Sequence, residues 1–329
     1  MLFVNVPIGA ALAIATPYVL PESKRTLGHL DLPGAITSTL GVSSLVFGLI
    51  HAASDGWSDP VTLGALALSA VMIVVFLFIE SHSPQPLMPL RLFSNRNRDA
   101  SYVVMLTTGA ALFSMFFFLT QFVQEILGYS PVQAGFAFLP VSVVIVISAQ
   151  IASRVIARTG ARPLVIFGAL LTGLALLWLS TIDASSGYLS LLLPSMVVMA
   201  FGLGFIFVPI TLTAVSGVES RDYGIASAML NVTQQLGGTI GLAALVTVFS
   251  TALTNFITSA VAGAAASGGP PSAQQLGQIR LDGLAHGWAT GFKAAVVFSL
   301  IALVAAIVGL RSTPIDAQAQ GQAQAAPAA

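Results

Sequence analysis

Residues 103–122 read VVMLTTGAALFSMFFFLTQF, a run of twenty residues without a single charge. A helix of about 20 apolar residues crosses the roughly 30 Å hydrocarbon core of a bilayer. The strands of a membrane β-barrel would instead alternate between apolar and polar residues over segments of about 10 residues. Because this run does not alternate, it predicts a transmembrane helix.

Runs of the same kind recur along the whole sequence. The chain has 329 residues, of which 56% are hydrophobic and 7% charged, whereas a soluble domain carries about 25% charged residues. The sequence therefore predicts an all-α polytopic membrane protein. We expect nine spans, at residues 2–20, 33–53, 61–79, 101–123, 132–153, 163–181, 188–214, 224–250 and 290–310.

The few charged and reactive residues exclude several classes of function. Twelve Lys and Arg balance twelve Asp and Glu, so no basic field for nucleic acid exists. The sequence has no cysteine and its four histidines lie in separate stretches, so we expect neither disulfides nor a metal site. G-x-S-x-G, H-E-x-x-H and paired acids within a span are missing, so we expect no enzyme and no cofactor.

Several loops carry the residues that begin helices. Asp59-Pro60 and Ser130-Pro131 each read as an N-cap followed by proline at the first helical position. Gln133 stands where a capping box needs it. Pro140 and Pro209 fall inside predicted spans, where proline bends a helix.

Basic residues in the short loops predict the orientation of the chain, because such residues stay on the cytoplasmic side. Ten of the twelve Lys and Arg residues lie after odd-numbered spans or directly after the last span. This places the C-terminus in the cytoplasm, and we expect the protein to lie in the inner membrane of the cell. Arg280 and Lys293 are the exceptions, and nine spans leave Met1 outside. The ten are Lys24, Arg25, Arg91, Arg96, Arg98, Arg154, Arg158, Arg162, Arg221 and Arg311.

Two segments do not read as membrane spans. Residues 262–287 are rich in Gly, Pro, Ala and Gln and predict a flexible outer loop. Residues 312–329 form a polar low-complexity tail that cannot bury a core, so we expect a disordered cytoplasmic end.

A series of short motifs resembles one known family. They are FVNVPIGA at residue 3, LDLPGA at 30, GWSDP at 56, PLMPLRLFSNR at 86, QEILGYSPVQAGFAFLP at 124, RVIARTGARP at 154 and GIASAMLNVTQQLGGTIG at 224. In this order they resemble the sixth helix and everything after it in the fourteen-helix drug:proton antiporters of the major facilitator superfamily, the QacA/EmrB type.

The resemblance implies a division of the chain and an activity. Residues 1–20 would be the last helix of the N-terminal bundle, residues 21–100 two linker helices with their cytoplasmic loops, and residues 101–311 the C-terminal six-helix bundle. The first five helices of the family would be absent, so we expect Met1 to be an internal start or a truncated gene model. A signal peptide cleaved after Ala13-Ile14-Ala15 is the weaker alternative, because no positive segment precedes it.

Proton coupling requires a group that changes charge inside the membrane. None of the twelve acids lies near the middle of a predicted span. The resemblance places the family's proton-linked acid in the first five helices. Glu125, about one turn inside the outer boundary, is a partial candidate, with an interfacial role as the alternative.

Amides within the spans are candidates for a substrate path, because a buried amide must find a partner. Asn231 and Gln235 share a helix face, as do Phe113, Phe117 and Gln121. An apolar, aromatic cleft with a few amides suits an amphipathic or cationic solute. Alternatively the amides only tie helices together, and we expect Phe116 and Phe118 to face lipid. The candidate path is Phe113, Phe117, Gln121, Asn231, Gln234 and Gln235.

Two further patterns have both a structural and a functional interpretation. Gly237 and Gly241 form a G-x-x-x-G, which lets two helices approach closely. Arg154, Arg158, Gly160 and Arg162 resemble the superfamily's cytoplasmic gating motif, although its usual acid is missing. A topology-setting basic loop explains the same arginines.

The sequence thus favours a secondary transporter that exports drug-like or amphipathic small molecules in exchange for protons across the lipid bilayer. The alternative is a non-transporting remnant or a membrane interaction partner. We expect a protein with all the family's helices to transport, and residues 1–329 alone not to do so.

Overall fold

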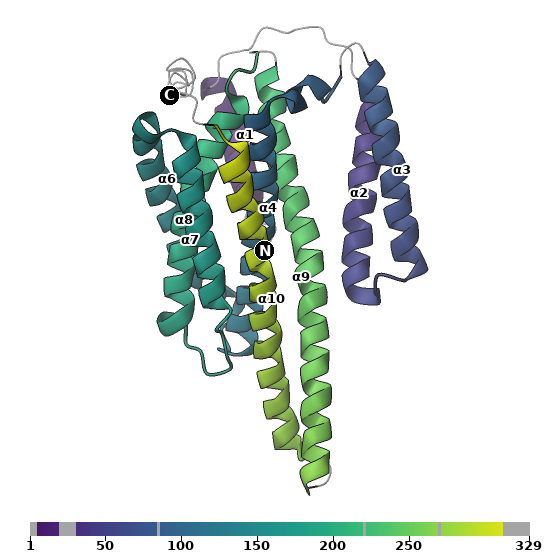
Figure 1. Cartoon of the computed structure of the whole chain (residues 1–329), viewed down its shortest axis with the longest axis vertical. Coiled ribbons are helices and arrows are strands. Elements are labelled where there is room, and N and C mark those ends of the chain that lie inside the picture. The colour runs from purple at the N-terminus through teal and green to yellow at the C-terminus, as the bar shows by residue number, and fades with distance from the viewer. Residues whose placement is uncertain (1–4, 20–30, 84–85, 220–221, 269–270, 312–329) are drawn as a thin grey trace.

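The computed structural model describes residues 5–19, 31–83, 86–219, 222–268 and 271–311, and in these ranges the chain folds into helices without strands (Figure 1). A short 3₁₀ helix, η2, and a π-helical turn, η3, join the α-helices. The elements are α1 (Asn5–Val19), α2 (Leu32–Asp55), α3 (Pro60–His82), η2 (Leu90–Ser94), α4 (Arg96–Glu125), α5 (Pro131–Ala137), α6 (Leu139–Thr159), α7 (Ala161–Leu179), η3 (Tyr188–Leu192), α8 (Leu193–Val215), α9 (Tyr223–Gly268) and α10 (Ala273–Gly309).

The helices account for the predicted spans. Eight helical segments among the described residues are long and apolar enough to cross a membrane, and they correspond to the second through ninth predicted spans. The first predicted span, 2–20, contains the 15-residue α1, and its ends lie outside the described residues. The all-α membrane fold is therefore confirmed.

The predicted helix starts are also confirmed. The Asp59 carboxylate accepts hydrogen bonds from the backbone N–H groups of Val61 and Thr62, with Pro60 at the first helical position. Ser130 and Gln133 form the reciprocal capping box. Pro140 marks a break, since α5 ends at Ala137 and α6 begins one residue before the proline.

The expectation of a loop at residues 262–287 is wrong. Helix α9 runs to Gly268 and α10 starts at Ala273, so most of the segment is helical. At 1.5 Å per residue the 46 residues of α9 span about 69 Å, and the α9–α10 pair extends beyond the other helices at one end (Figure 1). Ser272 and Gln275 start α10 with a capping box, which outweighs the Gly/Pro content before it.

Small residues set the distance between α4 and α9. A Cβ on Gly237 would overlap the backbone carbonyl of Leu106, and one on Gly241 would overlap Ala110. Gly109 on α4 lies equally close to the backbone of Gln234. The G-x-x-x-G pair of α9 thus lies in a glycine-rich contact that brings two backbones together.

The hairpin of α2 and α3 stands beside α9 (Figure 1), and α3 meets the rest of the described chain mainly through α2. Gly34, Gly41 and Gly48 recur every seventh residue on α2, so they share one face. A Cβ on Gly41 would lie 3.1 Å from Ile73 Cγ1, and one on Gly48 would lie 2.9 Å from Leu66 Cδ2. This spacing was not predicted, and it lets α3 lie close along α2.

Phe118 does not face lipid, contrary to expectation. It is fully buried, with its ring 5.6 Å from the Phe292 ring in an edge-to-face contact and 5.8 Å from the Phe249 ring. Gly291 leaves room for the ring on α10. Phe116 is partly buried against Phe138. Helix periodicity shows which residues share a face of α4. It does not show whether that face contacts lipid or another helix, because both are equally apolar.

Some expectations concern residues that the structure does not describe. These are the outer position of Met1, the basic residues Lys24, Arg25 and Arg221, and the tail at 312–329, which all lie outside the described ranges.

Candidate functional site

A cavity of about 330 Å³ lies between α2, α4 and α9. Its wall is almost entirely apolar. Its size is at the lower end of the range of small-molecule sites, which are typically apolar with a few polar groups. The lining residues are Val46, Leu49, Ile50, Ala53 and Ser54 from α2, Phe113 and Phe117 from α4, and Gly238, Thr239, Leu242, Ala243 and Val246 from α9.

Phe113 and Gly238 shape one wall of this cavity. The missing side chain of Gly238 leaves space that the Phe113 ring occupies, because a Cβ there would lie 2.7 Å from two ring carbons. The ring of Phe113 still keeps 39% of its exposure, and that of Phe117 keeps 36%. Both aromatic candidates of the substrate path therefore face open space in this structure.

The polar groups in the cavity wall are hydroxyls already bonded to their own helices. Ser54 donates to the carbonyl of Ile50 at 3.3 Å, and Thr239 donates to that of Gln235 at 3.0 Å. No charged side chain lines the cavity. Apolar burial is thus the main attraction that this cavity offers to a ligand.

The predicted amides do not line the cavity. Gln121 is half-buried two turns after Phe113, while Asn231 and Gln235 are exposed on α9 before the cavity begins. Gln234 is half-buried, with its backbone against Gly109. The structure thus brings together the aromatic part of the predicted path and leaves the amides outside it.

The α2 side of the cavity was missed by sequence reasoning. Its residues, from Val46 to Ser54, read as one apolar face of a span, and such a face predicts lipid as readily as a ligand. A signal was present in the spacing of Gly41 and Gly48, which turns the opposite face of α2 toward α3.

The arginine loop between α6 and α7 lies at the same end of the molecule as the starts of α4 and α9. Gly160 ends α6 with a φ of +78°, a conformation that favours glycine. Arg154 and Arg158 are exposed on the last turns of α6. Arg162 reaches across to α10 and donates to the carbonyl of Ile307 at 2.8 Å.

Other arginines at this end satisfy the free carbonyls of helix termini. The buried Arg98 guanidinium donates to the carbonyls of Ala214, Ser216 and Leu92 at 2.9, 3.3 and 3.1 Å. Arg96 donates to the carbonyl of Val308 at the end of α10. The last carbonyls of a helix lack partners within it, so these contacts stabilise α8 and α10.

An ion pair joins the segment after the hairpin to the start of α9. Arg91 Nη2 lies 2.6 Å from Oδ2 of the buried Asp222. The hydrogen bond to this carboxylate raises the pKa of Arg91, which therefore stays charged. In the sequence, the charge of Arg91 predicted only topology, and it did not predict that Asp222 is its partner.

The acids do not form a site within the described spans. Glu125 ends α4 with an exposed side chain, 4.0 Å from the guanidinium of Arg280. Glu80 is buried at the basic end, where it accepts hydrogen bonds from the backbone N–H groups of Leu87 and Met88 at 3.2 and 3.0 Å. The part of the chain that the structure describes holds no cluster of His, Asp or Glu suited to a metal ion.

Comparison with known proteins agrees with this fold. The sequence profile of the Major Facilitator Superfamily matches residues 2–242. The chain belongs to this superfamily. Its relatives include the puromycin resistance protein pur8 of Streptomyces alboniger, which is 35% identical over 99% of this chain and 63% of its own length.

Two further relatives of this superfamily protein carry export in their names. The cephamycin export protein CmcT of Amycolatopsis lactamdurans is 35% identical over 75% of the chain and 52% of its own length. The tetracenomycin C resistance and export protein of Streptomyces glaucescens is 32% identical over 74% of the chain and 45% of its own length. The chain thus spans between about half and two thirds of these relatives.

Proposed function

We propose that this superfamily protein takes part in proton-coupled export of amphipathic, drug-like compounds across a bacterial inner membrane. The observation that carries the proposal is the apolar cavity between α2, α4 and α9, with Phe113 and Phe117 facing it. The relatives named for antibiotic resistance and export support the same reading.

The arrangement of the helices supports a separate role for each part of the chain in this proposal. Helices α4 to α10, of which α5 and α6 together make one span, would serve as the C-terminal six-helix bundle. Helices α2 and α3 would be the linker helices, and α1 part of the other bundle. In a carrier of this class two bundles rock about a central site. The cavity lies where the linker hairpin meets the C-terminal bundle, so a ligand there would contact both parts.

The chemistry of the cavity indicates the class of substrate. A wall without charges binds the apolar body of a ligand. Gln121 lies outside the cavity, about one helical turn along the chain from the lining residue Phe117. Gln234 also lies outside it, about one turn along the chain from the lining residue Gly238. There the two amides can meet polar groups that project from the ligand. A compound with a bulky apolar or aromatic part and a polar end fits this pattern. The family resemblance supplies the proton as coupling ion, and the basic end of the molecule faces the cytoplasm by the positive-inside bias.

A transport assay tests the proposal. The chain is joined to the part of pur8 that the alignment leaves unmatched, and the chimaera is reconstituted in vesicles with an imposed proton gradient. We expect gradient-dependent movement of a lipophilic dye by the chimaera and none by residues 1–329 alone. A folded chimaera that moves no dye under a gradient would contradict the proposal and favour a non-transporting membrane partner.

A matched pair of variants locates the site. Ala53→Leu places a larger side chain in the cavity wall and should reduce transport by about 5- to 150-fold, since overpacking costs about 1–3 kcal/mol. Ala67→Leu makes the same change at an exposed position on α3 and should leave transport unchanged. Equal effects of the two substitutions would show that the cavity is not the site.

A further inference from the structure

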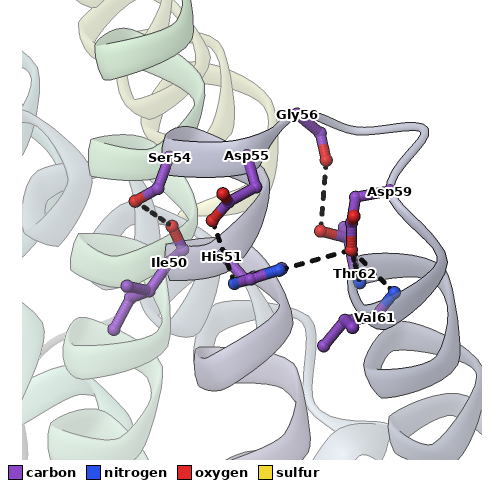
Figure 2. A network of polar contacts seen from close by, with 8 residues as sticks. All are labelled: Ile50, His51, Ser54, Asp55, Gly56, Asp59, Val61 and Thr62. Atoms are coloured by element: carbon purple, nitrogen blue, oxygen red, sulfur yellow. Dashed lines mark hydrogen bonds and ion pairs between the residues drawn. The ribbon is translucent and has the colours of Figure 1, made fainter.

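Both nitrogens of one histidine face carboxylates at the turn of the hairpin (Figure 2). His51, in the last two turns of α2, places Nδ1 3.2 Å from Asp55 Oδ2 and Nε2 3.3 Å from Asp59 Oδ2. Asp55 ends α2 and Asp59 caps α3, so the imidazole bridges the two helices across their turn.

The protonation state of the ring decides whether this bridge can exist. A neutral imidazole carries one N–H, so it can donate to one carboxylate while its other nitrogen presents a lone pair to the second. Only the imidazolium donates to both. The Phe47 ring, stacked on His51 with centroids 5.8 Å apart, adds an aromatic face on which a cation is favoured.

We propose that His51, Asp55 and Asp59 form a proton-binding site that closes the α2–α3 turn when His51 is protonated and releases it when the proton leaves. Histidine is the side chain that changes charge between pH 5 and 8. The inference concerns the hairpin itself and does not depend on the proposed export activity.

The charged groups that face His51 are the carboxylates of Asp55 and Asp59. The hydrogen bond from the backbone N–H of Thr62 is the largest effect on the pKa of Asp59 and lowers it. Burial, the next largest, raises this pKa, but the Val61 N–H and the His51 ring lower it further, so this carboxylate stays ionised. Apart from Tyr223 at its start, helix α9 carries no titratable side chain. Those of α3, Glu80 and His82, lie at the end of that helix away from the turn.

The same turn is connected to the cavity. Trp57 Nε1 donates to Thr247 Oγ1 on α9 at 3.0 Å, and Thr62 Oγ1 donates to the carbonyl of Gly56 at 3.1 Å. Ile50 and Ser54, one residue before and three after His51, line the cavity. Loss of the proton therefore loosens both the Trp57 contact with α9 and the edge of the cavity.

Fluorine NMR tests this proposal on the full chain, whose three tryptophans are replaced biosynthetically by 5-fluorotryptophan. The Trp57 resonance, assigned with Trp57→Phe, should move with a single midpoint between pH 5 and 8.5. The signals of Trp178 and Trp288 report whether each variant is folded. A Trp57 resonance that does not change over this range would overturn the proposal.

Four variants separate the proton site from a general pH effect. His51→Gln should abolish the transition, whereas His82→Gln should leave it unchanged, because that ring contacts Ser81 and the carbonyl of Phe78 instead. Asp55→Asn and Asp59→Asn should each lower the midpoint, because each removes one of the two carboxylates that stabilise the imidazolium. Asparagine retains the helix cap at position 59. A transition that persists in folded His51→Gln would contradict the assignment.

Discussion

Two neighbouring glycines on α9, Gly237 and Gly238, should differ in how much stability the same substitution costs. A methyl group on Gly237 would overlap the backbone carbonyl of Leu106, which cannot move unless α4 and α9 separate. A methyl group on Gly238 would meet the Phe113 ring, which can rotate because 39% of it is exposed. A methyl group at position 237 must therefore displace a helix backbone, whereas one at position 238 must displace only a side chain.

The expected magnitudes follow from these contacts. Overpacking costs about 1–3 kcal/mol, and alanine regains about 0.5–1 kcal/mol over glycine through its helix preference. Because the overlap at Gly237 is with backbone atoms, its cost should lie in the upper part of the overpacking range, so we expect Gly237→Ala to lower the free energy of unfolding by about 1–2.5 kcal/mol. For Gly238→Ala, a displaced ring costs about 0.5–1.5 kcal/mol, so the net change should stay within about 1 kcal/mol.

Equilibrium unfolding in mixed micelles, followed by far-ultraviolet circular dichroism, measures both values. Gly238→Ala should also push the Phe113 ring into the cavity and weaken ligand binding several-fold. If Gly237→Ala were as stable as the unmodified chain, or if both variants lost equal stability, the α4–α9 contact would not have the geometry described.

Other side chains give independent tests. Arg98→Gln should cost about 1–3 kcal/mol in unfolding free energy, because buried carbonyls at the end of α8 lose their donor, whereas Arg96→Gln at an exposed position should cost less; equal losses would contradict this. Ser272→Ala should destabilise the start of α10 by about 1 kcal/mol and speed amide exchange there, and unchanged exchange would argue against the cap. Phe118→Ala should lower the denaturation midpoint more than Phe116→Ala, and the reverse order would restore the lipid-facing assignment of Phe118.

Local chemistry in the sequence predicted the spans and several of their boundaries. The apolar run at 103–122 lies within α4, and the caps at Asp59 and Ser130 form as expected. These features depend on residues close together in the chain, where length and hydrogen-bonding capacity decide the outcome.

Amino-acid composition gave a wrong prediction for a segment that also contains a helix-capping motif. The segment at 262–287 looked like a linker because of its Gly and Pro content, yet Ser272 and Gln275 form the same capping box that identified the start of α5. Alanine, which is abundant there, is also the strongest helix former. The capping motif was the better predictor.

Partners between helices could not be read from the sequence. The burial of Phe118, the α2 wall of the cavity and the Arg91–Asp222 pair all join residues far apart in the chain. In a membrane protein a lipid-facing surface and a helix-facing surface are both apolar, so periodicity alone does not separate them. The His51 bridge likewise depends on the α2–α3 turn, which brings Asp55 and Asp59 to the two nitrogens of one imidazole, whereas proton sites are expected among carboxylates within spans.

We propose that the cavity between α2, α4 and α9 binds an amphipathic ligand. The most direct test is photolabelling of the purified chain with an azido derivative of a lipophilic dye, followed by mass spectrometry of the labelled peptides. We expect saturable labelling of the peptides that contain Phe113, Phe117 or Leu242, suppressed by unlabelled dye and weakened by Ala53→Leu. Saturable labelling confined to other helices, and unaffected by Ala53→Leu, would contradict it.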